Sequence, residues 1–225
     1  PFETNTNQAG DLLTVSVPLS GNLEDDESRA AVERLRNVII PAAFANTTAE
    51  AYVTGATAGT MDFVDSMYDK APYVFGFVLG FAFILMLVMF RSLVIPVKAV
   101  LLNLLSVGAA YGLMVLVIQK GFGAELLGFQ QARVIDAWIP LFLFSVLFGL
   151  SMDYHVFLLS RIRERYDVTH DNRGSVAFGL RSTANIITGA AAIMIVVFGG
   201  FAAGQLVPFQ QMGFGLAAAV IIAAT

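Results

Sequence analysis

The chain contains no cysteine, which excludes disulfide bonds and thiolate metal sites. Only 2 of its 225 residues are histidine, and the sequence has no His/Asp cluster, nucleophile elbow or phosphate-binding loop. The pair Gly121-x-Gly123 lacks the strand–loop–helix surroundings of a nucleotide site. We therefore expect neither an enzyme nor a bound cofactor or metal.

Charge is also scarce. Charged residues make up 13% of the chain, whereas soluble domains carry roughly 25%. Hydrophobic residues make up 57% and the mean hydropathy is +0.73, which is the composition of a membrane protein. The basic segment 161–181 lies beside a hydrophobic run, so nothing favours binding to nucleic acid.

Five apolar runs approach or exceed the roughly 20 residues that cross a bilayer. They cover residues 72–90, 94–118, 137–160, 184–204 and 207–225. We therefore expect an α-helical polytopic membrane protein with its transmembrane domain over residues 72–225. Because the chain begins at Pro1 and ends at Thr225 inside an apolar run, we interpret it as a piece of a longer protein.

Residues 1–71 predict part of an α+β domain with the order strand, helix, strand, helix. The first strand is expected where apolar residues alternate, at Leu13, Val15, Val17 and Leu19. The acidic run 24–27 predicts a helix that starts near residue 25 and ends at Pro41. Its predicted apolar face comprises Ala31, Leu35, Val38 and Ile39. A second strand is expected over residues 49–54, a loop over 55–59, and a helix over 61–69 that continues into the first span.

Lysine and arginine near the span ends predict the orientation. The connection 91–98 carries two of them and the connection 161–183 carries five, whereas the connection 119–136 has only Lys120 and Arg133. The first two connections are thus expected in the cytoplasm, where the arginines meet anionic lipid headgroups. Residues 1–71 are then expected on the extracytoplasmic side.

Glycines four residues apart let helices approach closely in lipid. The pairs Gly76 and Gly80 in the first span and Gly108 and Gly112 in the second are therefore predicted to pack helices. Gly149 is a further packing candidate, because it lies about one helical turn from the acid described next.

Asp153 is the one acid inside an otherwise apolar run of residues 138–160. It lies eight positions before Arg161, which is about 12 Å along a helix at 1.5 Å per residue. A carboxylate at such a depth costs about 2.5–3.5 kcal/mol, so a role in proton relay or ligand binding is expected. The alternative is an aspartate in a structural hydrogen bond between helices. Tyr154 can assist through its hydroxyl, whereas His155 lies about 200° around the helix and is not assigned as a partner.

Partners for Asp153 are expected on neighbouring spans. The candidates are Asn103, Ser106, Ser182, Thr183, Asn185 and Thr188. Each of them can instead bond to its own backbone. Neither lysine nor arginine occurs deep in any span, so a counter-charge is expected outside this chain.

The segment Gly149–Glu164, which contains Asp153 and Tyr154, resembles the Asp-Tyr signature of the MMPL ("mycobacterial membrane protein large") transporters. These transporters are part of the resistance–nodulation–division (RND) superfamily. Residues 90–98 and 103–106 are similar to the family's connection between helices eight and nine. The resemblance covers essentially the whole chain.

The resemblance implies twelve transmembrane helices in two repeats of six, each with an extracytoplasmic porter domain after its first helix. This chain would then hold the end of the second porter domain and helices eight to twelve of an RND-type bundle. Asp153 and Tyr154 would be half of a proton relay, with a second Asp-Tyr pair in the missing N-terminal repeat. Thr188 matches a polar relay position on helix eleven.

The resemblance further implies a multi-pass protein of the bacterial cell membrane that uses the proton gradient to export lipids or other hydrophobic compounds. The alternative is a non-transporting sensor or scaffold of sterol-sensing or Patched-like architecture, in which Asp153 is structural. The sequence leaves the cargo open, as well as the choice between monomer and homo-oligomer.

Overall fold

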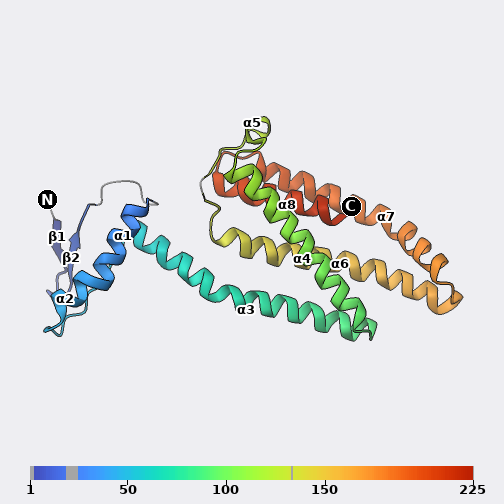
Figure 1. Cartoon of the computed structure of the whole chain (residues 1–225), viewed down its shortest axis with the longest axis horizontal. Coiled ribbons are helices and arrows are strands. Elements are labelled where there is room, and N and C mark those ends of the chain that lie inside the picture. Colours follow the sequence, from blue (N-terminus) through green and yellow to red (C-terminus); the bar gives the residue numbers. More distant parts are fainter. Residues whose placement is uncertain (1–2, 19–24, 133, 225) are drawn as a thin grey trace. The chain divides into compact units, whose positions relative to one another are not determined.

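The computed structural model describes residues 3–18, 25–132 and 134–224 (Figure 1). Leu19, Glu24, Arg133 and Thr225, on which predictions above depend, lie outside these residues. The chain divides into two compact units, Pro1–Tyr68 and Asp69–Thr225. Each unit is described by itself.

Five helices are long and apolar enough to cross a membrane, as judged by length and composition. They are α3 (Ala56–Phe90), α4 (Val94–Met114) with its π-helical continuation η2 (Val115–Gln119), α6 (Trp138–Thr169), α7 (Asn172–Ala202) and α8 (Val207–Ala224). A short helix, α5 (Ala124–Leu127), lies in the connection between α4 and α6. The predicted fold class is confirmed, and each of the five predicted spans overlaps one of these helices.

The first unit begins with an antiparallel hairpin of β1 (Glu3–Thr6) and β2 (Leu13–Ser16), in which Thr4 pairs with Val15. The strand predicted around Leu13 is therefore present, but it is exposed rather than half-buried. The second predicted strand is wrong, because residues 49–54 form an irregular connection. The partner of β2 instead precedes it in the chain, where Glu3–Thr6 has no apolar alternation to mark a strand.

The predicted helix near residue 25 is present as α1 (Asp26–Arg34), and acidic residues fill its first turn. It does not end at Pro41, because the π-helical segment η1 (Leu35–Ile39) continues directly into α2 (Ile40–Phe44). The Ile40 N–H donates to the Leu35 carbonyl five residues back. Pro41 is the second residue of α2 and has no N–H, so it donates no hydrogen bond back to η1. Val38 and Ile39, predicted to be on the apolar face, are exposed in this unit.

Helix α3 starts at Ala56, directly after Gly55 at φ +119. The loop predicted over residues 55–59 is thus wrong beyond Gly55. The predicted helix over residues 61–69 is confirmed, and it continues without a break through Pro72 to Phe90. In the first unit, Arg36 donates to the Asp62 carboxylate on α3, with Nη2 at 2.8 Å from Oδ2, and to the Val53 carbonyl at 3.0 Å.

The core of the second unit consists of buried apolar side chains from all five long helices. Helix α6 supplies its centre with Ile139, Leu143, Phe144, Leu147 and Phe148. The ring of Phe144 packs edge-on against Phe75 of α3 with centroids 4.3 Å apart. Helix α8 packs against α4, α6 and α7.

Two neighbouring glutamines at the start of α8 hold the connection that leads into α6. Gln211 accepts a hydrogen bond from the Asp136 N–H at 3.1 Å and donates to the Val134 carbonyl at 3.2 Å. Gln210 accepts from the Gln130 N–H at 3.3 Å and donates to the Gly204 carbonyl at 2.7 Å. The two glutamine side chains thereby form hydrogen bonds with backbone N–H and carbonyl groups that lie outside regular helices.

Close helix contacts occur at glycines other than those singled out from the sequence. A Cβ built on Gly213 of α8 would lie 2.4 Å from the Ala202 nitrogen and 2.5 Å from the Phe198 oxygen of α7. The same atom on Gly76, Gly80, Gly108, Gly112 or Gly149 would meet nothing within 4 Å. The role of these five glycines in helix packing therefore stays a prediction.

We expect Gly213→Ala to destabilise the protein by about 1–3 kcal/mol, because the methyl group meets backbone that cannot move aside. Gly200→Ala on the facing turn of α7 is the matched control, since its Cβ would enter open space. Thermal unfolding of the full-length protein in detergent measures the difference. Equal melting temperatures for the two variants would contradict the contact.

Candidate functional site

Asp153 lies on the exposed side of α6. No described residue makes a hydrogen bond or ion pair with its carboxylate. The buried residues of the same helix include Leu147, Phe148 and Ser151, on the opposite sector. Near Asp153, the fully buried side chains of α6 therefore lie on the side away from the carboxylate.

The expected contact beside Gly149 is not formed among the described residues, since a Cβ on Gly149 would meet nothing within 4 Å. A neighbouring helix beside Asp153 and Gly149 therefore stays a prediction. Helix α6 is apolar on nearly all sides, so its pattern does not mark which sector packs. The predicted relay role of Asp153 is not tested by this geometry.

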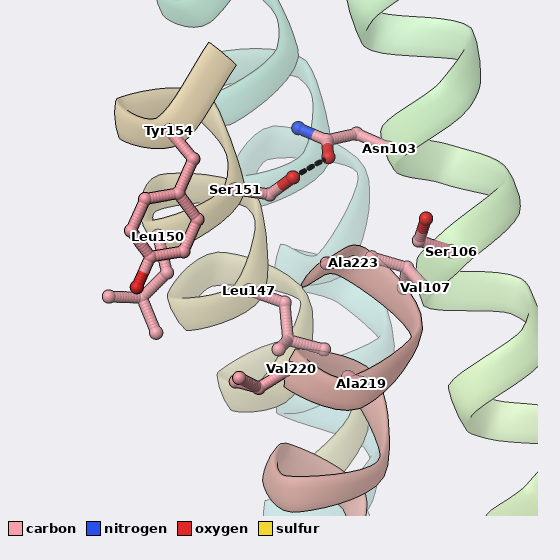
Figure 2. Close-up of a pocket in the computed structure, with 10 residues that line it drawn as sticks. All are labelled: Asn103, Ser106, Val107, Leu147, Leu150, Ser151, Tyr154, Ala219, Val220 and Ala223. Atoms are coloured by element: carbon pink, nitrogen blue, oxygen red, sulfur yellow. Dashed lines mark hydrogen bonds between the residues drawn. The ribbon is translucent and has the colours of Figure 1, made fainter. Parts of the chain in front are cut away.

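A buried polar pair joins α6 to α4. The Ser151 hydroxyl donates to the Asn103 side-chain oxygen (Figure 2). Asn103 is 2% exposed and Ser151 is 7% exposed. A second bond between the two helices runs from the Tyr111 hydroxyl to the Pro140 carbonyl. Asn103 thus accepts a hydrogen bond from Ser151, and it is not bonded to Asp153, for which it was a candidate partner.

The other candidate partners that form hydrogen bonds do so with their own helix. Thr183 donates to the Gly179 carbonyl at 2.8 Å, and Thr188 donates to the Ala184 carbonyl at 2.7 Å. Ser106 and Ser182 make the same kind of backbone bond. Asn185 is exposed on α7. These four hydroxyl groups therefore donate to carbonyls of their own helix, which was the alternative to a bond with Asp153.

A cavity of about 290 Å³ lies between α6, α7 and the end of α8. Tyr154 and Thr188, two of the three predicted relay residues, both line it. The Tyr154 hydroxyl is 3.6 Å from the Met194 sulfur, which is a weak acceptor. The structure thus brings Tyr154 and Thr188 to one cavity, while Asp153 lies outside its lining.

His155 also lines this cavity. Its Nδ1 is 2.9 Å from the Ser151 carbonyl oxygen. Because a carbonyl only accepts, this contact requires a proton on Nδ1. The helical wheel considered only the sector of Asp153 and so missed the cavity on this side.

Ser151 is the polar residue that the sequence reasoning missed. Its position on the wheel, about 160° from Asp153, is in the sector that is buried. A hydroxyl in that sector and Asn103 in the preceding span were the available signals. Their pairing required knowing which faces of α4 and α6 meet.

The comparison with known families now applies to this geometry. A model of the MMPL family matches residues 5–225. The chain belongs to the MMPL family. The Asp-Tyr pair and the cavity therefore lie in the part of the chain that the MMPL model matches. The five apolar helices agree with a multi-pass membrane protein of this family.

Curated MMPL relatives cover nearly the whole chain. The chain is 42% identical over 215 residues to the mycolic acid-containing lipids exporter MmpL11 of Mycolicibacterium smegmatis. This match covers 96% of the chain and 22% of that protein. The chain is 41% identical to the heme uptake protein MmpL11 of Mycobacterium tuberculosis (94% and 21%). It is 33% identical to the trehalose monomycolate exporter MmpL3 of M. smegmatis (78% and 17%).

The chain spans about a fifth of the length of these relatives. Their names describe transport proteins and not enzymes, in agreement with the expectation from the sequence.

We expect Ser151→Ala to destabilise this MMPL chain by about 1–3 kcal/mol, because it leaves the buried Asn103 oxygen without its donor. Ser145→Ala on the same helix is the control, since Ser145 donates only to the Leu141 carbonyl one turn back. Unfolding of both variants of the full-length protein in detergent tests this. A loss at Ser151 no larger than that at Ser145 would contradict the pair's contribution.

Proposed function

We propose that this chain is part of a proton-motive-force-driven transporter in the bacterial cell membrane that exports lipids or other hydrophobic compounds. Asp153 and Tyr154 form half of its proton relay, and Thr188 is a further relay position. The observation that carries this proposal is the Asp153 carboxylate, which is exposed on an apolar helix and has no partner among the described residues.

A charged carboxylate at this depth costs about 2.5–3.5 kcal/mol when it has no partner. A partner that approaches the exposed side of α6 would offset this cost. Alternation between these two surroundings lets Asp153 take up a proton on one side of the membrane and release it on the other. We propose that the partner group belongs to the N-terminal repeat of the same protein.

Tyr154 is the neighbour that links this acid to the protein interior. Its ring lines the 290 Å³ cavity on the α7 side, and its hydroxyl has only the Met194 sulfur as a partner. A phenol can donate and accept a proton in the same step. Thr188 presents a second hydroxyl at the same cavity, although it bonds to its own backbone in this state.

The proton gradient supplies enough energy for such a cycle. Each proton that enters releases about 2.3 kcal/mol per 100 mV of membrane potential. This is close to the cost of about 2.5–3.5 kcal/mol for a charged aspartate at the centre of a helix. A change in the protonation state of Asp153 can therefore shift the packing of α6 against its neighbours.

The cargo class follows from the relatives. Two of them are named exporters of mycolic acid-containing lipids and of trehalose monomycolate. We propose a lipid cargo on this basis, with a long acyl chain as the shared chemistry. Membrane lipids surround the five spans, and a homo-oligomer is compatible with this role.

Asp153→Asn in the full-length protein tests the relay. We expect proton-dependent lipid export to fall by about 100-fold or more, since a positioned proton-transfer group typically contributes 10²–10⁴-fold. Export and proton flux are measured in proteoliposomes with an imposed pH gradient. The control is Asp167→Asn at the far end of α6, where the carboxylate lies 3.9 Å from Arg163 and is exposed.

Retained proton-driven export in Asp153→Asn, in a protein that folds normally, would overturn the relay. It would favour the sensor or scaffold alternative, in which Asp153 is structural.

The proposed orientation places residues 1–71 outside the cell and the connection between α6 and α7 in the cytoplasm. Since this chain has no cysteine, an introduced one is its sole thiol. We expect Thr47→Cys to react with a membrane-impermeant maleimide on intact cells, and Asn172→Cys to react only after lysis. Both positions are exposed, and the reverse pattern would contradict the orientation.

A further inference from the structure

His155 brings an imidazole to the wall of the 290 Å³ cavity. Its Nδ1 lies 2.9 Å from the Ser151 carbonyl oxygen, and this bond holds the ring in one orientation. The other ring nitrogen, Nε2, has no partner among the described residues. In that part of the chain, the one buried side-chain nitrogen or oxygen without a partner is Nδ2 of Asn103. The His155 Nε2 is therefore accessible.

An accessible imidazole nitrogen can exchange protons. When the neutral ring carries its proton on Nδ1, Nε2 is free to accept a second proton. The ordinary pKa of imidazole, about 6.5, is the side-chain value closest to neutral pH. Such a group takes up and releases protons between about pH 5 and 8. The proposed relay of Asp153, Tyr154 and Thr188 does not yet include it.

The surroundings of this imidazole place no fixed charge beside it. The other titratable side chain in the cavity wall is Tyr154, on the same helix. Among the described residues, α7 contributes apolar and threonine side chains to the wall, and α8 contributes two alanines. The Thr183 and Thr188 hydroxyls donate to their own helix, so their oxygens are left to accept hydrogen bonds. A space of 290 Å³ also holds several water molecules, since about 10–15 Å³ is enough for one.

The cavity extends toward the end of α6 and α7 that carries arginines. The two helices are antiparallel neighbours joined by a short turn (Figure 1). On α6 the wall continues from Tyr154 to Leu158, which lies three positions before Arg161. On α7 the wall reaches Leu180, directly before Arg181. One cavity therefore connects the Tyr154 ring with the charged end of both helices, and the imidazole lies in its wall.

We propose that His155 is a proton-accepting residue that takes a proton from Tyr154 at Nε2 and releases it to water at the arginine-bearing end of the cavity. Tyr154 gives up its hydroxyl proton to the imidazole and regains one from Asp153, which is left as a carboxylate. The imidazolium then loses its added proton to water, so one proton moves in each cycle. This role rests on the proposed function, because it extends the relay, whereas the accessible imidazole itself does not.

Modification by diethyl pyrocarbonate tests the accessible imidazole without any transport measurement. The reagent attacks neutral imidazole, and peptide mapping of the full-length protein in membranes locates the product. We expect His155 to be modified, with a rate that falls as the pH is lowered. His170, which is exposed at the end of α6, is the reference. An unmodified His155 under conditions that modify His170 fully would overturn the site.

Proton flux in proteoliposomes tests the role of His155. The pH is raised on both sides at a constant pH difference, so that the driving force stays the same. We expect flux through the unmodified protein to rise with pH, because neutral His155 accepts protons. In His155→Asn the flux should fall several-fold and lose this rise, although the amide can still donate to the Ser151 carbonyl. His170→Asn is the control, since asparagine suits the left-handed backbone there (φ 54).

Two further variants separate proton transfer from a structural role. His155→Gln places an amide near the position of Nε2 and should lose flux as His155→Asn does, even if one of the two folds poorly. His155→Glu restores a titratable group, so it should recover flux, with the rise at lower pH because the ordinary pKa of glutamate is about 4.3. An unchanged flux and pH profile in His155→Asn, or no recovery in His155→Glu, would overturn the role.

Failure of this role and failure of the relay give different results. Retained flux in Asp153→Asn would remove the relay and leave the modification of His155 as it was. Failed flux in Asp153→Asn together with an unchanged pH profile in His155→Asn would keep the relay and remove His155 from it.

Discussion

Hydrocarbon offers no hydrogen bonds, and this constraint decides where nearly every polar side chain of the second unit lies. Serines and threonines on α4, α6 and α7 return their hydroxyls to carbonyls of their own helix. Gln210 and Gln211 each satisfy both ends of the amide by holding backbone between the helices. The spanning helices can then pack through apolar side chains with few uncompensated polar groups.

Two groups depart from this rule, and they lie on opposite sides of the same helix. Asp153 faces outward from α6 without a partner among the described residues, and Asn103 faces α6 from α4 with one atom unpaired. The proposed relay would supply Asp153 with a proton or with a group from another part of the protein. Tyr154 lies between these two sides.

The sequence predicted what depends on composition and local pattern. The five spans, the start of α1 at Asp26 and the helical approach to the first span follow from apolar runs and helix-terminal charge. Features that depend on which surfaces meet were missed. The pairing of β2 with β1 depends on a partner with no apolar alternation, and the packed face of α6 is hidden by an apolar surface on nearly all sides. The contact of Ser151 follows from that packing, and the contact of Gly213 follows from the packing of α8 on α7. Both were therefore missed as well.

Pro72 gives α3 a mechanical property that the other spanning helices lack. A proline has no N–H, so the carbonyl of Tyr68, four residues earlier, loses its helical donor. Tyr68 is also the last residue of the first compact unit. The backbone of α3 therefore has one hydrogen bond fewer at this turn, and a helix bends most readily at such a place.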